Sequence, residues 1–225
     1  MKLNLAAGLA FLLVTVTTGV LANDFTIDDF STGTYLSPQY RNGQHSSSQY
    51  GSMRGENRST TIFVCSTPAD CNLRNPFKQV ASYTFQAASA TSPSAFIASA
   101  GFEVYPRIDM GYGAGAPMSV NFTPYKRLRV NFKGLTQPLN FNIQLFTGTT
   151  WAQNGCNING LNRDFSVELP FTGFIISGGG FSWANVNLIN LIFQSGSVIG
   201  GVDFAIASVE ASDTAKPGAQ VCQLK

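Results

Sequence analysis

Two segments near the middle of the chain alternate strictly between apolar and polar residues. They are "RLRVNFK" at 127–133 and "NFNIQLF" at 140–146, and every second residue in each is apolar. A period of two buries one face of a segment and leaves the other in water, which is the pattern of a half-buried β-strand. Because the linker "GLTQPL" is short, we expect these two strands to pair as an antiparallel hairpin.

The rest of the chain also favours short strands. We expect further strands at 25–30, 59–65, 79–86, 95–105, 165–169, 188–193 and 202–209. Polar or glycine-rich stretches at 36–53, 88–94 and 111–117 are typical of loops. Beyond the N-terminal segment, the sequence shows no helical period that lasts three turns. The pattern predicts a single all-β domain, an antiparallel β-sandwich of the jelly-roll type.

The chain begins with the features of a secretory signal. Lys2 precedes an apolar run, and Val20-Leu21-Ala22 offers a small-residue cleavage site. We expect residues 1–22 to be removed, which leaves 23–225 as the β-sandwich, with a C-terminal tail from about residue 212. The protein should then be secreted and extracellular, or periplasmic in a bacterium, with no membrane association after cleavage.

Four cysteines follow this signal: Cys65, Cys71, Cys156 and Cys222. An even number in a secreted chain predicts two disulfide bonds. Three pairings are open, and we favour a short local loop, Cys65–Cys71, with Cys156–Cys222 tying the tail to the body. A zinc site is disfavoured, because the sequence contains no CxxC pair and only one histidine, His45.

The charge balance gives no sign of a nucleic acid partner. Removal of Lys2 leaves a net charge near +1, and only 12% of the residues are charged. The surface must then stay soluble largely through Asn, Gln, Ser and Thr, which also suit neutral polar ligands such as sugars.

The polar faces of the two alternating strands are the best candidate for ligand binding. If the two strands share one curved sheet, their outward side chains line a groove for an oligo- or polysaccharide. These side chains are Arg127, Arg129, Asn131, Lys133, Asn140, Asn142 and Gln144. Trp151, Trp183 and Tyr112 are candidates for stacking on sugar rings. An ordinary solvated strand face explains the same residues, so this alternative stays open.

No catalytic residues are predicted. The sequence has no ExDxxE strand and no G-x-S-x-G elbow, so glycosidase and serine hydrolase chemistry find no support. A polysaccharide lyase stays open as an alternative, with Tyr105 as base and Arg107 neutralising a uronate. A structural or self-associating extracellular protein without sugar binding is the other alternative.

Four segments, taken in order, resemble a known class of domain. They are "TIDDFSTG", "MRGENRSTTIFV", "FSWANVNLINLIFQSG" and "GGVDFAIASVEA". This order is similar to that of secreted β-sandwich domains related to carbohydrate-binding modules and galactose-binding-like domains. The resemblance implies a β-sandwich and a non-catalytic role, either binding a glycan or acting at the cell surface or in the extracellular matrix.

The same resemblance implies a structural Ca²⁺ site that uses an acidic residue of the first strand, here Asp28 or Asp29. The last strand departs from the pattern, since Ala207 and Ser208 stand where an Asp is usual. Alternation also places Asp28 and Asp29 on opposite faces of an extended strand, so they cannot act together as a catalytic pair.

Overall fold

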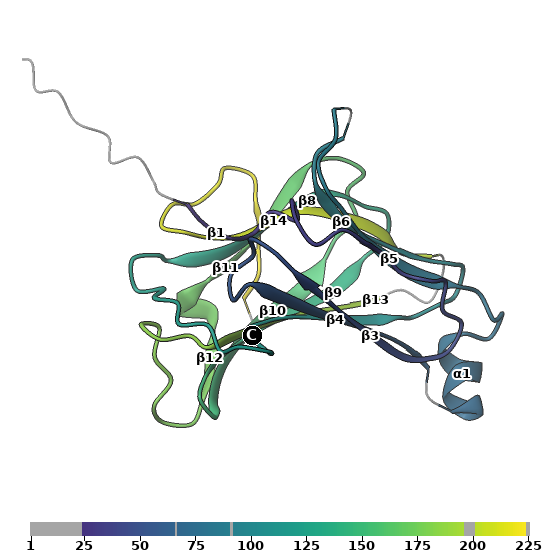
Figure 1. Cartoon of the computed structure of the whole chain (residues 1–225), viewed down its shortest axis with the longest axis horizontal. Helices are drawn as coiled ribbons and strands as arrows, with labels where there is room; N and C mark the ends of the chain where they lie inside the picture. The colour runs from purple at the N-terminus through teal and green to yellow at the C-terminus, as the bar shows by residue number, and fades with distance from the viewer. Residues whose placement is uncertain (1–23, 66, 91, 196–200, 224–225) are drawn as a thin grey trace, which may run out of the picture.

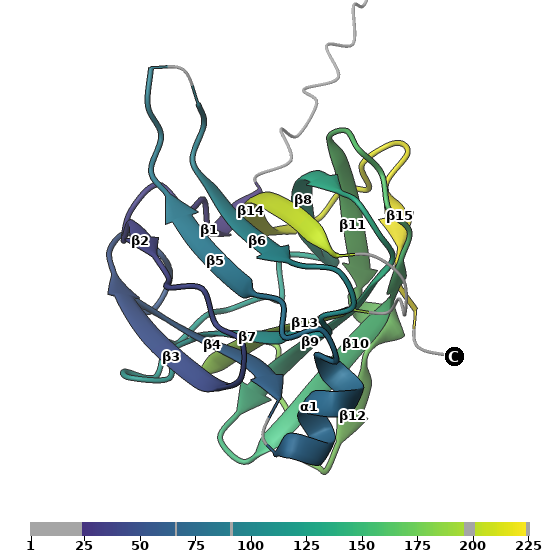
Figure 2. The ribbon, with the colours of Figure 1, turned by 90° about the vertical axis from the view of Figure 1, so that its right-hand side faces the viewer.

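The computed structural model describes residues 24–65, 67–90, 92–195 and 201–223, which form two β-sheets facing one another (Figures 1 and 2). Sheet A has the strand order β15-β11-β8-β14-β6-β5-β2, with β1 also paired to β14, and sheet B has the order β12-β10-β9-β13-β7-β4-β3. Among the described strands, neighbours run antiparallel except β11 and β15. The expected antiparallel β-sandwich is confirmed.

The strands of sheet A are β1 (Phe25–Asp28), β2 (Tyr35–Leu36), β5 (Ala81–Gln86), β6 (Ala95–Ala100), β8 (Arg127–Leu135), β11 (Phe165–Pro170), β14 (Asp203–Ser212) and β15 (Gln220–Val221). Those of sheet B are β3 (Gly43–Tyr50), β4 (Asn57–Cys65), β7 (Arg107–Tyr112), β9 (Leu139–Thr147), β10 (Thr150–Ile158), β12 (Ile175–Ser177) and β13 (Leu188–Ser195). One short helix, α1 (Pro68–Arg74), and a 3-10 turn, η1 (Phe171–Gly173), complete the described elements.

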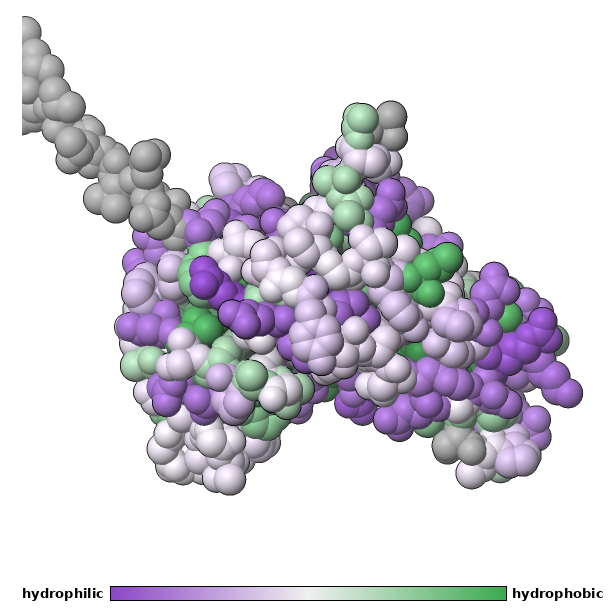
Figure 3. Space-filling view, viewed as in Figure 1, coloured by the Kyte–Doolittle hydropathy of each residue, from purple (hydrophilic) through white to green (hydrophobic). Residues whose placement is uncertain are grey.

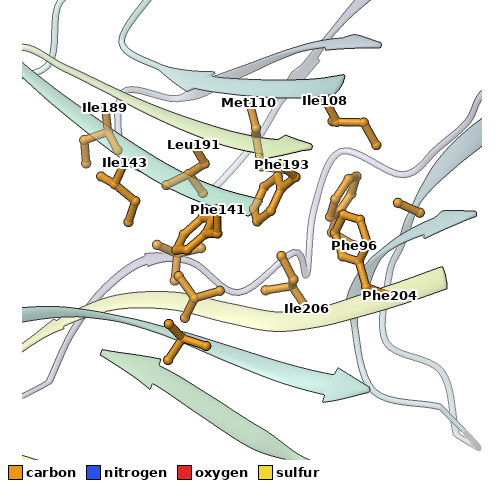
Figure 4. Close-up of a cluster of buried hydrophobic side chains, with 14 of the residues drawn as sticks. Phe96, Ile108, Met110, Phe141, Ile143, Ile189, Leu191, Phe193, Phe204 and Ile206 are labelled. Carbon is orange, nitrogen blue, oxygen red and sulfur yellow. The ribbon is translucent and has the colours of Figure 1, made fainter. Parts of the chain in front are cut away.

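The core lies between the sheets and is dominated by phenylalanine (Figure 4). Phe141 and Phe193 of sheet B stack with ring centroids 5.0 Å apart, and Phe193 meets Phe204 of sheet A at 5.3 Å. Phe204 in turn packs edge-on against Phe96. Each of these rings is buried, and burying one such side chain contributes roughly 1.5–3 kcal/mol.

Every strand expected from the sequence is found, but three long strands were not expected. β3 lies within the stretch 36–53, whose composition is typical of a polar loop, and the sequence pattern does not predict β7 or β10. The inward side chains of β3 include Ser47 and Gln49, which hydrogen-bond within the sandwich and so give no hydrophobic alternation. β10 buries Asn154 on its inward face, where alternation looks for an apolar residue.

The predicted hairpin of 127–133 with 140–146 is wrong. β8 belongs to sheet A and β9 to sheet B, and the short link between them crosses from one sheet to the other. Leu135 and Leu139, on either side of this link, are both buried between the sheets. Alternation shows which residues of a strand face the core. It does not show whether the link to the next strand stays within one sheet, as in a hairpin, or crosses to the other sheet.

Both favoured disulfides are present, Cys65–Cys71 and Cys156–Cys222. The first bond joins the last residue of β4 to the middle of α1, and the second joins the tail, just after β15, to β10 of sheet B. The predicted signal segment, 1–22, lies outside the described residues. Within the part of the chain that the structure describes, no helix is long and apolar enough to cross a membrane.

Candidate functional site

The predicted sugar-binding residues separate into two groups on opposite faces of the sandwich. Arg127, Arg129, Asn131 and Lys133 lie on β8 in sheet A, whereas Asn140, Asn142, Gln144 and Trp151 lie on β9 and β10 in sheet B. The single groove expected from all eight residues is therefore not formed. Each face has to be judged by its own contacts.

On sheet A, the two arginines are engaged by acidic residues. Glu168 accepts hydrogen bonds from Arg127 Nη1 at 2.8 Å and from Arg129 Nε at 3.0 Å. Arg129 also contacts Glu210 at 2.8 Å and donates to the backbone oxygen of Thr214 in the tail at 2.6 Å. Their charges stabilise the packing of the tail on sheet A, so these two residues are poor candidates for binding a sugar.

Glu168 is buried beneath this tail, and burial alone favours the neutral acid. The backbone N–H of Lys216 and the guanidinium groups of Arg127 and Arg129 outweigh burial and lower the pKa of Glu168 below its usual value of 4.5. A carboxyl whose pKa is lowered by folding stabilises the folded state above the unfolded pKa, and this contribution is lost as pH falls through the folded pKa.

We therefore expect Glu168→Gln to lower the free energy of unfolding by about 2 kcal/mol at pH 7, the scale of hydrogen bonds to charged groups. The difference in free energy of unfolding between the wild type and the variant should become smaller as pH falls below 4.5. Urea unfolding over a pH series measures this. Asp164→Asn is the control, because its ion pair with Lys133 is exposed and should matter little. If this difference in free energy stays constant down to pH 3, the charge of Glu168 is not the source of its contribution to stability.

The outer face of sheet B carries a broad array of neutral side chains. Strand register aligns its outward residues in three rows that cross the sheet. The first row holds Ile175, Gln153, Gln144, Asn190, Gly111, Ser59 and Ser48; the second holds Gly155, Asn142, Ile192, Asp109, Thr61 and Ser46; the third holds Asn157, Asn140, Gln194, Arg107, Phe63 and Gln44. With neighbouring strands about 4.8 Å apart, the seven-strand first row spans roughly 29 Å.

Amides dominate this array, and its charges cancel. Arg107 and Asp109 bind each other through two N–H···O contacts of 2.7 and 2.8 Å. Asn140 donates to Asn157 across neighbouring strands at 3.2 Å. Among the side chains that the structure describes, the Oδ1 of Asn142 is buried and lacks a hydrogen-bond partner.

The outer face of sheet B is hollowed. It faces downward in Figure 1, and in Figure 3 the lower outline of the molecule is recessed between the β12 end and the α1 end. A cavity of about 360 Å³ lies on this face near α1, lined among others by Gln44, Phe63, Arg107 and Gln194. The amide rows therefore line a recessed surface with a distinct pocket.

Aromatic rings stand at the ends of the array. Trp151 and Phe146 are register partners near β12, and Tyr50 is 72% exposed on β3. Two of the predicted stacking residues do not belong to this face. Tyr112 is fully buried in the core, and Trp183 stacks on Phe171 at 4.2 Å in a cluster of aromatic rings.

Several residues of the array were not predicted, including Gln153, Asn157, Asn190 and Gln194. The segment "NLINLIF" places Asn190 outward, but Ile192 beside it is also outward, and this obscured the alternation. A search for amides in register with Asn140, Asn142 and Gln144 could have found these residues, had the strand order been known.

The residues considered for catalysis or metal binding are placed less favourably. Burial and the nearby charge of Glu103 raise the pKa of Tyr105, which opposes a role as base, and Arg107 is engaged by Asp109. Asp28 is buried and accepts a hydrogen bond from Tyr112, whereas Asp29 is exposed and caps Ser31.

The Ca²⁺ site at Asp28 or Asp29 stays a prediction. Within the described ranges, no group of three or more His, Cys, Asp or Glu side chains could hold a metal ion. Because Asp28 points into the sandwich and Asp29 to solvent, the two carboxylates do not share a site.

No model of a protein family matches the chain, and no curated protein matches it either. Among solved structures, it is similar to the family 11 carbohydrate-binding module of the cellulosomal cellulase Lic26A-Cel5E of Clostridium thermocellum, with 12% identity over 88% of this chain and 99% of that one, at a TM-score of 0.42. A family 11 module from the same organism in complex with a β-1,3-1,4-mixed-linked tetrasaccharide is 10% identical over 86% of this chain and 99% of that one, at 0.39. At these values the matches carry no argument about function.

Proposed function

We propose that this protein is a non-catalytic module that binds a neutral glycan chain on the outer face of sheet B. The observation that carries the proposal is the set of amide side chains aligned in register across the hollowed face of the sheet. Such a surface suits an extended ligand that presents many hydroxyl groups along its length.

The chemistry of the face favours hydroxyl groups over charged groups. Each Asn or Gln side chain offers both donors and acceptors, so it can pair with a hydroxyl in either role. Because Arg107 and Asp109 neutralise one another, the face attracts neither anions nor cations strongly.

The aromatic end of the face would add apolar contact. Trp151 and Phe146 are register partners there, and the flat ring of Trp151 can cover the C–H face of a sugar. Aromatic side chains commonly dominate binding energy in such contacts. We therefore assign Trp151 as the stacking residue and the amides as the residues that set orientation.

We further propose that the protein acts outside the cytoplasm. The two disulfides, Cys65–Cys71 and Cys156–Cys222, support this proposal, because such bonds persist in oxidising compartments.

The test is binding of the purified protein to soluble neutral polysaccharides, measured by affinity electrophoresis and calorimetry. The panel comprises mixed-linkage β-1,3-1,4-glucan, xyloglucan, glucomannan and laminarin. We expect Trp151→Ala to weaken binding at least tenfold and Asn190→Ala to weaken it about two- to tenfold. Matched controls are Phe77→Ala, an exposed ring beside α1, and Gln86→Ala, an amide on sheet A.

Two results would count against the proposal. The first is that no polysaccharide retards the protein in affinity electrophoresis, although circular dichroism shows that the protein is folded. An equal loss in Gln86→Ala and Asn190→Ala would show that binding does not use sheet B. Release of unsaturated uronate from an acidic polysaccharide, followed by ultraviolet absorbance, would instead indicate a lyase.

A further inference from the structure

Two segments cross the outer face of sheet A and leave a pocket of about 490 Å³ between them. One wall is the stretch before and into β11, which contains Arg163 and Asp164, and the other is the tail from Lys216 to Ala219. The floor is formed by residues of β8, β11 and β14. Pockets that hold small molecules have volumes of about 300–1,000 Å³, so this pocket is large enough for one.

The floor is a fixed row of polar groups. Ser166 Oγ donates to Asn131 Oδ1 at 2.6 Å, and Asn131 Nδ2 donates to Ser208 Oγ at 2.9 Å. Since the Ser208 hydroxyl accepts in this row, its own hydrogen stays available for another acceptor. The row therefore presents a donor at the base of the pocket.

Positive charge surrounds the floor. Lys133, Arg163 and Lys216 line the pocket, against one acid, Asp164, which pairs with Lys133 at 2.9 Å. Lys216 Nζ lies 3.1 Å from Asn131 Oδ1, and an ammonium has two further N–H donors. The acids just beyond are Asp24, Glu168 and Glu210, and their pairing with Arg127 and Arg129 offsets all but one of their charges.

We propose that this pocket binds a small anionic ligand, through a carboxylate, sulfate or phosphate group held between Lys216 and Arg163 above the donor row. The site lies on the opposite sheet from the proposed glycan face and has the opposite chemistry, a net positive pocket rather than a neutral surface. Of the residues expected to bind sugar, Asn131 and Lys133 belong to this second site. The proposal does not rest on glycan binding.

The test is an NMR titration of ¹⁵N-labelled protein at constant ionic strength. The probes are glucuronate, glucose, inorganic sulfate and inorganic phosphate. We expect an anion to shift the amides of Asn131, Ser208 and 216–219 saturably, whereas glucose leaves them unchanged. If glucuronate causes the shifts, the ligand group is a carboxylate. If sulfate or phosphate causes them, the ligand group is a tetrahedral oxyanion.

Variants decide whether the charge of the pocket is responsible. Arg163→Gln and Lys216→Gln should each weaken anion binding about fivefold or more, since each removes a cation next to the bound charge. Arg41→Gln, an exposed cation outside the pocket, should bind as the wild type does, and so should Trp151→Ala on the other sheet. The proposal is overturned if no anion shifts the pocket amides, if glucose shifts them equally, or if Arg41→Gln loses as much affinity as Arg163→Gln.

Discussion

Replacing Arg58 by methionine should lower the free energy of unfolding by about 4 kcal/mol, the scale for breaking a buried ion pair. For a domain of about 200 residues, this corresponds to a fall in Tm of roughly 10 °C. Methionine keeps the unbranched stem of the side chain and removes the guanidinium, with its charge, its donors and its contact with Phe85. Chemical and thermal unfolding, followed by circular dichroism, measure both quantities.

The size of this effect follows from the position of Arg58 between the sheets. Its guanidinium is fully buried, reaching from β4 in sheet B to pair with Asp28 of β1 in sheet A. It also lies 3.6 Å from the ring centroid of Phe85 and donates to the backbone oxygen of Thr32 at 3.2 Å. Without it, the carboxylate of Asp28 remains buried with Tyr112 and the Phe30 N–H as donors but no counter-ion.

Three further variants test this explanation. Arg54→Met is the matched control, because Arg54 is exposed and stacks on Phe25 at the surface, so we expect a loss below about 1 kcal/mol. The double variant Arg58→Met/Asp28→Asn should be more stable than Arg58→Met alone, because it no longer buries an unpaired carboxylate. The single variant Asp28→Asn completes the cycle: if its loss and that of Arg58→Met simply add in the double variant, Arg58 and Asp28 are not coupled.

The buried ion pair also explains where sequence patterns predict this fold and where they do not. Alternation identified β8, β9 and β11, because their inward residues are mostly apolar. It missed β3, whose inward Gln49 lies beside the Arg58 guanidinium and whose Ser47 contacts Tyr83. A polar network in the sandwich places polar residues on the inward face of its strands, and the pattern then resembles a loop.

The candidate site was predictable only in part, for a related reason. Asn140, Asn142 and Gln144 could be placed on one strand face, and the structure keeps them together on sheet B. Their neighbours Asn190 and Gln194 come from a strand about fifty residues later in the chain. Which strands lie side by side depends on long-range pairing across the sandwich, and periodicity within a segment carries no information about it.

The pairing of the cysteines was easier to predict, since short spacing favours the local bond Cys65–Cys71 and leaves Cys156–Cys222. The two bonds close loops of very different length, with sequence separations of 6 and 66. In the chain-entropy description, a longer closed loop restricts the unfolded chain more. The two bonds should therefore differ in their effect on stability.

Replacing Cys156 and Cys222 together by alanine should lower the free energy of unfolding by about 4 kcal/mol, and the same replacement of Cys65 and Cys71 by about 2 kcal/mol. Urea unfolding of the two double variants compares them under one set of conditions. Amide hydrogen exchange in residues 213–223 should also be faster in the Cys156/Cys222 variant than in the wild type. In this variant the tail loses its disulfide bond to β10 and is held by β15, which pairs with β11 over only two residues.

Loosening of the tail has a further consequence that separates the two variants. The tail supplies the Lys216 N–H to Glu168 and the Thr214 oxygen to Arg129, so its release leaves two buried charges on sheet A less well satisfied. The Cys65/Cys71 variant leaves these contacts intact and should show wild-type exchange in the tail. If that variant loses more stability than the Cys156/Cys222 variant, or if its tail exchanges faster, then loop length and tail anchoring do not determine the contribution of these bonds.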